Sequence, residues 1–165
     1  MFKVRSATKA DARAIAEIYN SGITERVATF ETRLRTTEDV ESWFDEPHPV
    51  VVTCDDEGAV RGFASCSGYR NRECYRHIAE FSVYVAPSQR GLGLGRLALE
   101  GLVVKATELG YLKLISRIFV ENVASRGLVK RLGFREVGIY NRHAKLDGDW
   151  RDVVIVELLL GEAKQ

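Results

Sequence analysis

Three glycines at alternate positions form the stretch of this sequence best suited to hold a ligand, Arg90–Gly95 (RGLGLG). Glycine gives the backbone conformations that other residues avoid, and it leaves no side chain to block a ligand. A helical pattern starts directly afterwards, and the free N–H groups of a helix N-terminus favour an anion such as phosphate. An ordinary tight turn between a strand and a helix explains the glycines equally well. The neighbouring segments must therefore decide between the two interpretations.

The segments on either side of these glycines predict a strand and a helix. Phe81–Val85 mixes aromatic and β-branched residues, which is typical of a largely buried strand, and Pro87 ends it. Leu97–Val103 carries an apolar helical pattern. A Rossmann fold places such a loop after its first strand, with an acidic residue about 20 positions later. Here the loop lies past the middle of the chain, so we do not expect a dinucleotide site.

The remaining elements give the order βααβββαβαββ. Two T-x-x-D capping boxes, at Thr8 and Thr36, each predict the start of a helix, and Gly22 is expected to end the first one. The turn residues 55–58 predict a hairpin, and Gly110 predicts a helix end. Hairpins give antiparallel pairs and strand–helix–strand units give parallel pairs, so we expect a mixed sheet with helices on both faces. The expected strands are 2–6, 50–54, 59–67, 81–85, 112–120, 135–142 and 152–160, with a turn at 147–149 between the last two.

The 165-residue chain has the composition of an ordinary soluble globular protein, with 45% hydrophobic and 28% charged residues. We expect one domain, residues 1–165. A net charge of +1 gives no reason to expect nucleic acid or an anionic membrane as a partner. The N-terminus lacks a signal-peptide pattern, and no apolar run is long enough to span a bilayer. The three cysteines lack metal-site spacing and suit a reducing compartment, so we expect a cytoplasmic protein without a metal.

Two motifs give the chain a resemblance to the GCN5-related N-acetyltransferases, the GNAT superfamily. The R-x-x-G-x-G signature corresponds to Arg90–Gly95, and the second signature, N-x-x-[AS]-x-x-L followed by L-G-F, corresponds to Asn122–Leu128 and Leu132–Phe134. Together the motifs cover roughly residues 76–135, and the expected order of elements extends the match to the whole chain. The resemblance implies an α/β (α+β) GNAT fold, in which a mixed, mostly antiparallel sheet of about seven strands is flanked by about four helices.

The resemblance also implies acetyl-coenzyme A as the acetyl donor. The backbone of Val83 and Val85 would pair with the pantetheine arm as a further strand would. The amides of the glycine-rich loop and its arginines would hold the pyrophosphate, while Asn122 would reach the pantetheine and Ser125 the adenine end. The residues assigned to the coenzyme are Val83, Val85, Arg90, Gly91, Leu92, Gly93, Leu94, Gly95, Arg96, Asn122 and Ser125.

Four further segments are similar to the phosphinothricin N-acetyltransferase branch, and within it to the arsinothricin-type enzymes. These segments are Val27–Phe30, Tyr69–Tyr75, Glu80–Val85 and Lys145–Val153. That branch acetylates the α-amine of small amino acids that carry a phosphinate, arsinate or sulfone-type group. The resemblance therefore implies such an amino acid analogue as the substrate. It also implies a homodimer, whose interface would suit the apolar residues 153–160.

Acetyl transfer to an amine needs a group that accepts the ammonium proton. Glu80 is the expected general base, acting directly or through a water, at the head of the strand that would hold the acetyl group. Strand alternation places Ser82 and Tyr84 on the same face, and the apolar neighbours of Glu80 would desolvate its carboxylate. A surface carboxylate paired with Arg70 or Arg72 is the alternative interpretation of Glu80.

The developing oxyanion and the leaving thiolate also need partners. A backbone N–H near Tyr84 or Val85 is expected to stabilise the oxyanion. Many members of the family carry a tyrosine acid where this chain has Val129, which cannot donate a proton. Either Tyr84, Tyr140 or water protonates the thiolate, or no enzymic acid is needed.

A substrate with a carboxylate and a second anionic group calls for fixed cations. Arg70 and Arg72 are two apart, so on an extended segment both would point the same way. A guanidinium group suits two-point binding of a carboxylate or phosphinate, although a solvated charged surface is the alternative interpretation. The expected substrate-binding residues are Phe30, Arg70, Arg72, Tyr75, His143 and Lys145.

Two other functions stay open at this point. A related enzyme could acetylate a peptide N-terminus or a polyamine, but a polyamine site would need acidic residues where Arg70 and Arg72 stand. A protein that binds coenzyme A without catalysis is the second alternative, because Val129 removes the usual proton donor.

Overall fold

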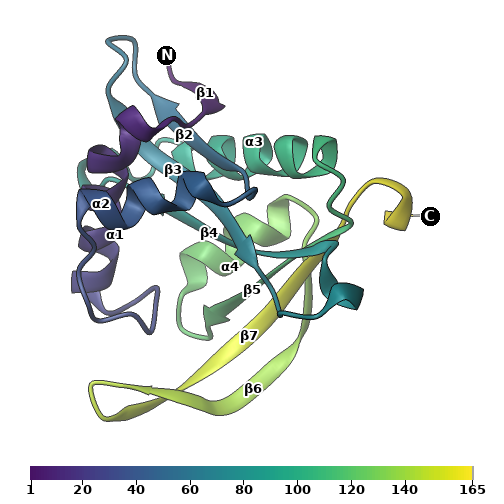
Figure 1. Ribbon diagram of the computed structural model, residues 1–165. Coiled ribbons are helices and arrows are strands. Elements are labelled where there is room, and N and C mark those ends of the chain that lie inside the picture. The colour runs from purple at the N-terminus through teal and green to yellow at the C-terminus, as the bar shows by residue number, and fades with distance from the viewer. Residues whose placement is uncertain (165) are drawn as a thin grey trace.

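A mixed sheet of seven strands, in the order β1-β2-β3-β4-β5-β7-β6, carries the fold (Figure 1). The structure is a computed structural model and describes residues 1–164. The order of elements is the predicted βααβββαβαββ. The strands are β1 (Lys3–Ser6), β2 (Val50–Cys54), β3 (Val60–Gly68), β4 (Ile78–Val85), β5 (Lys113–Phe119), β6 (Arg135–Leu146) and β7 (Asp149–Leu159). The α-helices are α1 (Ala12–Glu25), α2 (Thr37–Glu41), α3 (Leu94–Glu108) and α4 (Val123–Arg131).

The strand pairs follow from the lengths of their connections. β1 to β4 are neighbours in antiparallel pairs, as are β5 with β7 and β6 with β7. β4 and β5 are parallel, because α3 fills the crossover between them. The mixed, mostly antiparallel sheet expected from the sequence is therefore confirmed.

Helices cover both faces of the sheet. On one face, α3 and α4 bury Leu99, Leu102 and Val129 against Phe81 and Leu114. On the other, α1 and α2 lie over β2 and β3 in a second apolar cluster that contains residues such as Ile15, Val40 and Phe63. Figure 1 shows the β6–β7 hairpin extending beyond the helices at one end of the sheet. No helix within residues 1–164 is long and apolar enough to cross a membrane.

Helix α1 continues past the glycine that was expected to end it. The prediction that Gly22 terminates α1 is wrong, because the helix runs to Glu25 and ends at Arg26, whose φ is 60°. Gly22 instead allows a close approach, since a Cβ there would lie 2.7 Å from Cδ1 of Tyr84. This packing sets α1 directly against β4.

The last two strands are longer than expected. β6 runs to Leu146 and β7 begins at Asp149, so the turn is shorter than the predicted 147–149. Three valines of β7 are each at most 1% exposed and are buried in the core of the single chain: Val153, Val154 and Val156. The suggestion that the apolar residues of this strand form a dimer interface is therefore wrong for these positions.

Candidate active site

β4 and β5 separate soon after they pair. They are paired only over Ile78–Glu80 with Lys113–Ile115, whereas β4 stays paired with β3 as far as Val85. The edge of β4 that faces β5 is therefore open beyond Glu80. The hydroxyl of Ser116 reaches across this gap and donates to the carbonyl of Phe81 at 3.0 Å. An extended chain that carries amides can add to such an edge as a further strand.

The glycine-rich loop leads into α3 beyond the open edge. Gly91 and Gly93 have φ of 81° and 83°, a backbone conformation that L-residues rarely adopt. Gly95 permits close packing, because a Cβ there would lie 3.3 Å from Cδ2 of Leu128 and 3.7 Å from Cγ2 of Val85. The first N–H groups of α3 have no partners within the helix, so this end of α3 favours an anion.

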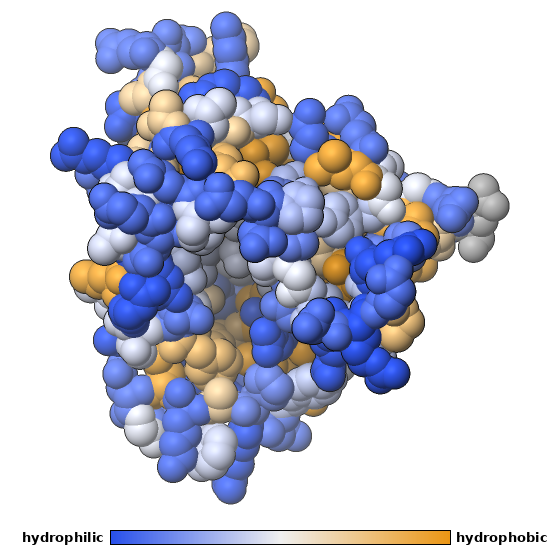
Figure 2. Space-filling view, in the orientation of Figure 1, coloured by the Kyte–Doolittle hydropathy of each residue, from blue (hydrophilic) through white to orange (hydrophobic). Residues whose placement is uncertain are grey.

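A cavity of about 460 Å³ lies between the gap, the loop after α1 and the β6–β7 hairpin. Figure 2 shows this face of the molecule recessed near its middle, with apolar atoms inside the recess and charged residues around it. The volume is in the range of small-molecule sites. The sequence-predicted residues that line the cavity are Phe30, Glu80, Val83, Tyr84, Asn122, Ser125 and His143.

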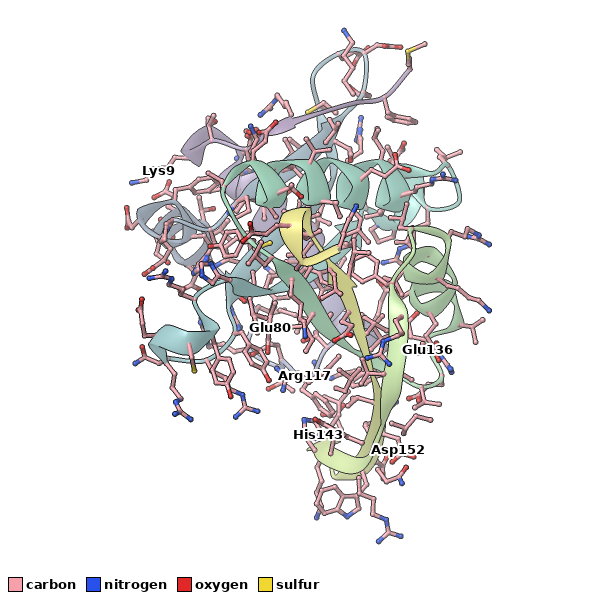
Figure 3. All side chains as sticks on the ribbon, turned by 90° about the vertical axis from the view of Figure 1, so that its right-hand side faces the viewer. Lys9, Glu80, Arg117, Glu136, His143 and Asp152 are labelled. Atoms are coloured by element: carbon pink, nitrogen blue, oxygen red, sulfur yellow. The ribbon has the colours of Figure 1, made fainter. Side chains whose placement is uncertain are left out.

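Glu80 lies on this cavity beside a cation that the sequence analysis did not select. Both of its carboxylate oxygens contact one guanidinium nitrogen of Arg117 on β5, at 3.3 and 3.2 Å, and its side chain is 29% exposed. Figure 3 shows the two side chains together, with His143 below them on the hairpin. The alternative interpretation, a surface carboxylate paired with Arg70 or Arg72, is therefore wrong, because the partner of Glu80 is Arg117. Glu80 and Arg117 both line the cavity, so Glu80 is placed to accept a proton from a ligand there.

Tyr84 forms a wall of the cavity on the same face of β4. Its ring stacks on Phe63 with centroids 5.5 Å apart and lies 5.1 Å from the ring of Tyr19 on α1. Burial raises the pKa of Tyr84, so its phenol stays protonated at neutral pH. A protonated phenol can donate a proton to a leaving group.

The side chains expected to hold the coenzyme have partners within the chain. Arg90 forms a two-point ion pair with Glu25 at the end of α1. Arg96 pairs with Glu100 one helical turn further on, at 2.8 Å. Asn122 caps α4 by accepting from the Ser125 amide at 3.2 Å. A coenzyme that uses the two arginines would have to exchange these contacts for its own oxygens.

The expected substrate cations lie outside the cavity. The guanidinium groups of Arg70 and Arg72 lie over the rings of Tyr69 and Tyr75, at 5.1 and 5.9 Å from the centroids. The Lys145 ammonium lies over the Trp150 ring at 5.0 Å. In the part of the chain that the structure describes, none of these side chains lines either large cavity. Their role in substrate binding stays a prediction, as does that of Tyr75.

Arg117 and a second cavity are the features that sequence reasoning missed. Arg117 was detectable as a charged residue inside the otherwise largely apolar strand 112–120. The second cavity, of about 250 Å³, adjoins the first and shares Tyr19, Ser82 and Tyr84 with it. It is formed by residues far apart in the sequence, so no local pattern indicates it.

A sheet that opens beside a carboxylate and a glycine-rich helix N-terminus suits an enzyme that transfers an acyl group from an extended amide-bearing carrier. Residues 14–134 match the model of the acetyltransferase (GNAT) family, and the chain belongs to this family. It is 34% identical to the L-amino acid N-acyltransferase MnaT of Escherichia coli (strain K12), covering 96% of this chain and 94% of that protein. It is 33% identical to the L-methionine sulfoximine/L-methionine sulfone acetyltransferase of Salmonella typhimurium, covering 96% and 95%.

A solved structure supports both the GNAT fold and the similarity to the phosphinothricin branch of the family. The phosphinothricin acetyltransferase of Sinorhizobium meliloti, whose structure is a complex with acetyl-CoA, superimposes with a TM-score of 0.91 at 34% identity. The match covers 98% of this chain and 89% of that one. The GNAT fold and the similarity to the phosphinothricin branch, both expected from the sequence, are confirmed.

Proposed function

We propose that this protein uses acetyl-CoA to acetylate the α-amine of a small anionic amino acid analogue of the phosphinothricin, arsinothricin or methionine sulfone type. One domain, residues 1–165, carries the whole activity. The observation that carries the proposal is the open edge of β4, with Glu80 placed where β4 leaves β5. The relatives named for acetylation of methionine sulfone and phosphinothricin support the substrate class.

Acetyl-CoA occupies the gap between the two strands. Its pantetheine amides pair with the backbone of Val83 and Val85, and its pyrophosphate binds the amides of Gly91–Gly95 at the N-terminus of α3. Asn122 and Ser125 contact the coenzyme from α4. The open strand edge and the two left-handed glycines support this arrangement.

Transfer is direct, within a complex of enzyme, donor and amine. Glu80 takes a proton from the ammonium, and the neutral nitrogen attacks the thioester carbonyl to form a C–N bond. A backbone N–H of β4 near Tyr84 or Val85 stabilises the oxyanion, the C–S bond then breaks, and Tyr84 donates its proton to the thiolate. The second proton that the nitrogen loses as it becomes an amide restores the Tyr84 phenol, and Glu80 releases its proton to water. The place of Tyr84 on the wall of the cavity supports its role as the proton donor, and Val129, which is 3% exposed, offers no proton.

The surroundings of the site complete the proposal. Arg70, Arg72 and Lys145, which lie outside both cavities, add positive charge around the site that favours an anionic substrate, and Phe30 and Tyr75 supply apolar walls. A homodimer would bring such side chains to a site from a second copy. The exposed apolar residues Val137, Ile139 and Tyr140 of β6 support an interface there, at 44–53% exposure. The free cysteines Cys54, Cys66 and Cys74 are compatible with the cytoplasm.

A turnover assay with phosphinothricin, arsinothricin and methionine sulfone tests this function. We expect release of coenzyme A thiol together with one equivalent of the N-acetyl product. Turnover of a peptide N-terminus alone would move the protein to another substrate class. Binding of acetyl-CoA without turnover of any amine would favour a coenzyme A-binding sensor, the reading that Val129 keeps open.

The Tyr84→Phe variant tests the proton donor. It keeps the buried ring and removes the hydroxyl, so we expect about tenfold slower turnover at pH 7 with unchanged affinity for acetyl-CoA. Unchanged turnover would show that the thiolate leaves without an enzymic acid.

A further inference from the structure

Arg117 is held loosely by its partner. The contacts of 3.2 and 3.3 Å to Glu80 are longer than the 2.7–2.9 Å typical of a charged hydrogen bond. The Arg117 side chain is 48% exposed and lines the main cavity. Within residues 1–164 its guanidinium makes no other hydrogen bond to a side chain or carbonyl. An anionic group that enters the cavity can therefore bind Arg117 without breaking strong hydrogen bonds.

An α-amino acid carries its amine and its carboxylate on the same carbon atom. A substrate that brings its amine to Glu80 therefore brings its carboxylate within reach of a neighbouring group. Arg117 is that neighbour on β5, because Glu80 is in register with Ile115 at the last β4–β5 pair. Glu80 therefore faces the ammonium group of the amino acid, and Arg117 faces its carboxylate.

The second cavity lies on the other side of Glu80. Ser67 is opposite Glu80 in the β3–β4 register, and Ser65 is opposite Ser82. All three serines line this cavity, and within residues 1–164 their hydroxyls make no hydrogen bond. They can therefore donate to oxygen atoms of a ligand.

The remaining walls of the second cavity are aromatic side chains together with His48, Cys66 and the charged residues Arg35 and Glu46. His48 shares a hydrogen bond of 2.8 Å between its Nδ1 and the Tyr111 hydroxyl, which leaves Nε2 free for a ligand. Trp43 and Phe63 supply apolar surface, with ring centroids 6.0 Å apart. Arg35 also lines the cavity, but Glu31 neutralises it at 2.8 Å.

We propose that Arg117 binds the α-carboxylate of the substrate and that the second cavity binds its side chain, an inference that rests on the proposed function. Neighbouring strands are about 4.8 Å apart, so the row from β5 through β4 to β3 spans about 10 Å, the length of a short extended amino acid. Serine hydroxyls and His48 donate to the oxygen acceptors of a tetrahedral group such as a sulfone, which is neutral and is therefore not repelled by the Glu46 carboxylate on the same wall. The aromatic walls hold its methyl group. The site thus selects an α-amino acid whose side chain ends in such a group.

The Arg117→Ala variant tests whether Arg117 binds the α-carboxylate, when the acetylation of two amines is compared. Methionine sulfone carries the carboxylate, and 3-(methylsulfonyl)propylamine is the same molecule without it. We expect kcat/KM to fall about tenfold to hundredfold for methionine sulfone and less than about threefold for the amine, because one charged hydrogen bond is lost. Arg117→Lys should restore part of the loss, and Arg13→Ala, a surface cation paired with Glu17, should change neither value.

Equal losses for both amines would overturn this assignment, because they would mean that Arg117 only supports the charge of Glu80. If the wild-type enzyme does not acetylate the amine without a carboxylate, its inhibition constant takes the place of kcat/KM. That constant should then be insensitive to Arg117→Ala.

The Ser65→Ala/Ser67→Ala variant tests the second half. We expect the ratio of kcat/KM for methionine sulfone to that for methionine to fall about tenfold, since methionine lacks the sulfone oxygens. Ser21→Ala, which removes a surface hydroxyl of α1, is the control. An unchanged ratio would overturn the role of the second cavity.

Failure of the proposed acetylation activity can be distinguished from failure of this binding-site inference. A wild-type protein that acetylates no amino acid refutes the function itself. Calorimetric titration of methionine sulfone into the coenzyme A complex then tests the binding site alone. Binding that is weakened by Arg117→Ala keeps the inference, and no binding overturns it.

Discussion

Glu25 at the end of α1 holds both terminal nitrogens of Arg90 in the glycine-rich loop, at 2.7 and 2.5 Å. The hydrogen bond from Arg90 lowers the pKa of Glu25, so the carboxylate is ionised at neutral pH. The next two residues are also tied to distant segments. Arg26 pairs with Asp147 at 2.9 Å, and the Val27 carbonyl accepts from Asn122 at 3.4 Å. The segment that precedes the cavity loop therefore links the proposed coenzyme site to the closing hairpin.

The Glu25–Arg90 pair predicts a competition with the pyrophosphate of acetyl-CoA. Glu25→Gln removes the competing charge, so we expect the Kd for acetyl-CoA to fall about threefold. Arg90→Ala removes a ligand, so we expect the Kd to rise about tenfold. Both values come from calorimetric titration, with Glu17→Gln on the exposed side of α1 as the control. Unchanged affinity in both variants would leave Arg90 with a purely structural role.

Gly22 and Gly127 form a matched pair of helical glycines. A Cβ at Gly22 would lie 2.7 and 2.8 Å from two atoms of the Tyr84 ring, whereas a Cβ at Gly127 would meet nothing within 4 Å. We expect Gly22→Ala to destabilise the fold by about 1–3 kcal/mol. Gly127→Ala should stabilise it by up to about 1 kcal/mol, because alanine favours the helix. Urea unfolding measures both, and a stabilising Gly22→Ala would contradict the packing of α1 on Tyr84.

Asp11 predicts a pH dependence of stability. Its carboxylate accepts from Arg5 at 2.8 and 2.9 Å and from the Thr8 amide at 2.8 Å, and the residue is 7% exposed. The bond from Arg5 lowers the pKa of Asp11 below its ordinary value of 3.8. Its stabilisation is therefore complete above the unfolded pKa and is lost as the pH falls through the folded one.

The Asp11→Asn variant isolates this contribution. We expect it to lower the free energy of unfolding by about 1–3 kcal/mol at pH 7 and by progressively less below pH 4. Urea unfolding at several pH values gives both numbers, with Asp149→Asn at the exposed start of β7 as the control. A difference that does not vary with pH would mean that the charge of Asp11 is unimportant.

Local signals made much of the fold predictable. The capping boxes at Thr8 and Thr36 and the cap at Asn122 depend on residues three apart, and all are present. The glycine-rich loop is followed by the predicted helix. Such features depend on residues that are neighbours in the sequence, so a single sequence is enough to predict them.

Features that depend on distant contacts were not predictable. Gly22 looked like a helix end, but its neighbour is Tyr84, and the helix ends at Arg26, which Asp147 contacts from 121 residues away. The partner of Glu80 is Arg117 because two strands that are far apart in sequence lie side by side. Arg70 and Arg72 were selected by their spacing, their guanidinium chemistry and the family-like segment around them, and they lie outside both cavities.

Acetylation of methionine sulfone by the Glu80→Gln variant tests the central claim most directly. Glutamine keeps the size of the side chain and removes its capacity to accept a proton, so we expect kcat at pH 7 to fall about a hundredfold or more. The Kd for acetyl-CoA should stay unchanged, and Glu136→Gln, which also removes an arginine-paired carboxylate, should keep wild-type kcat (Figure 3). A Glu80→Gln variant that turns over at the wild-type rate would contradict the account.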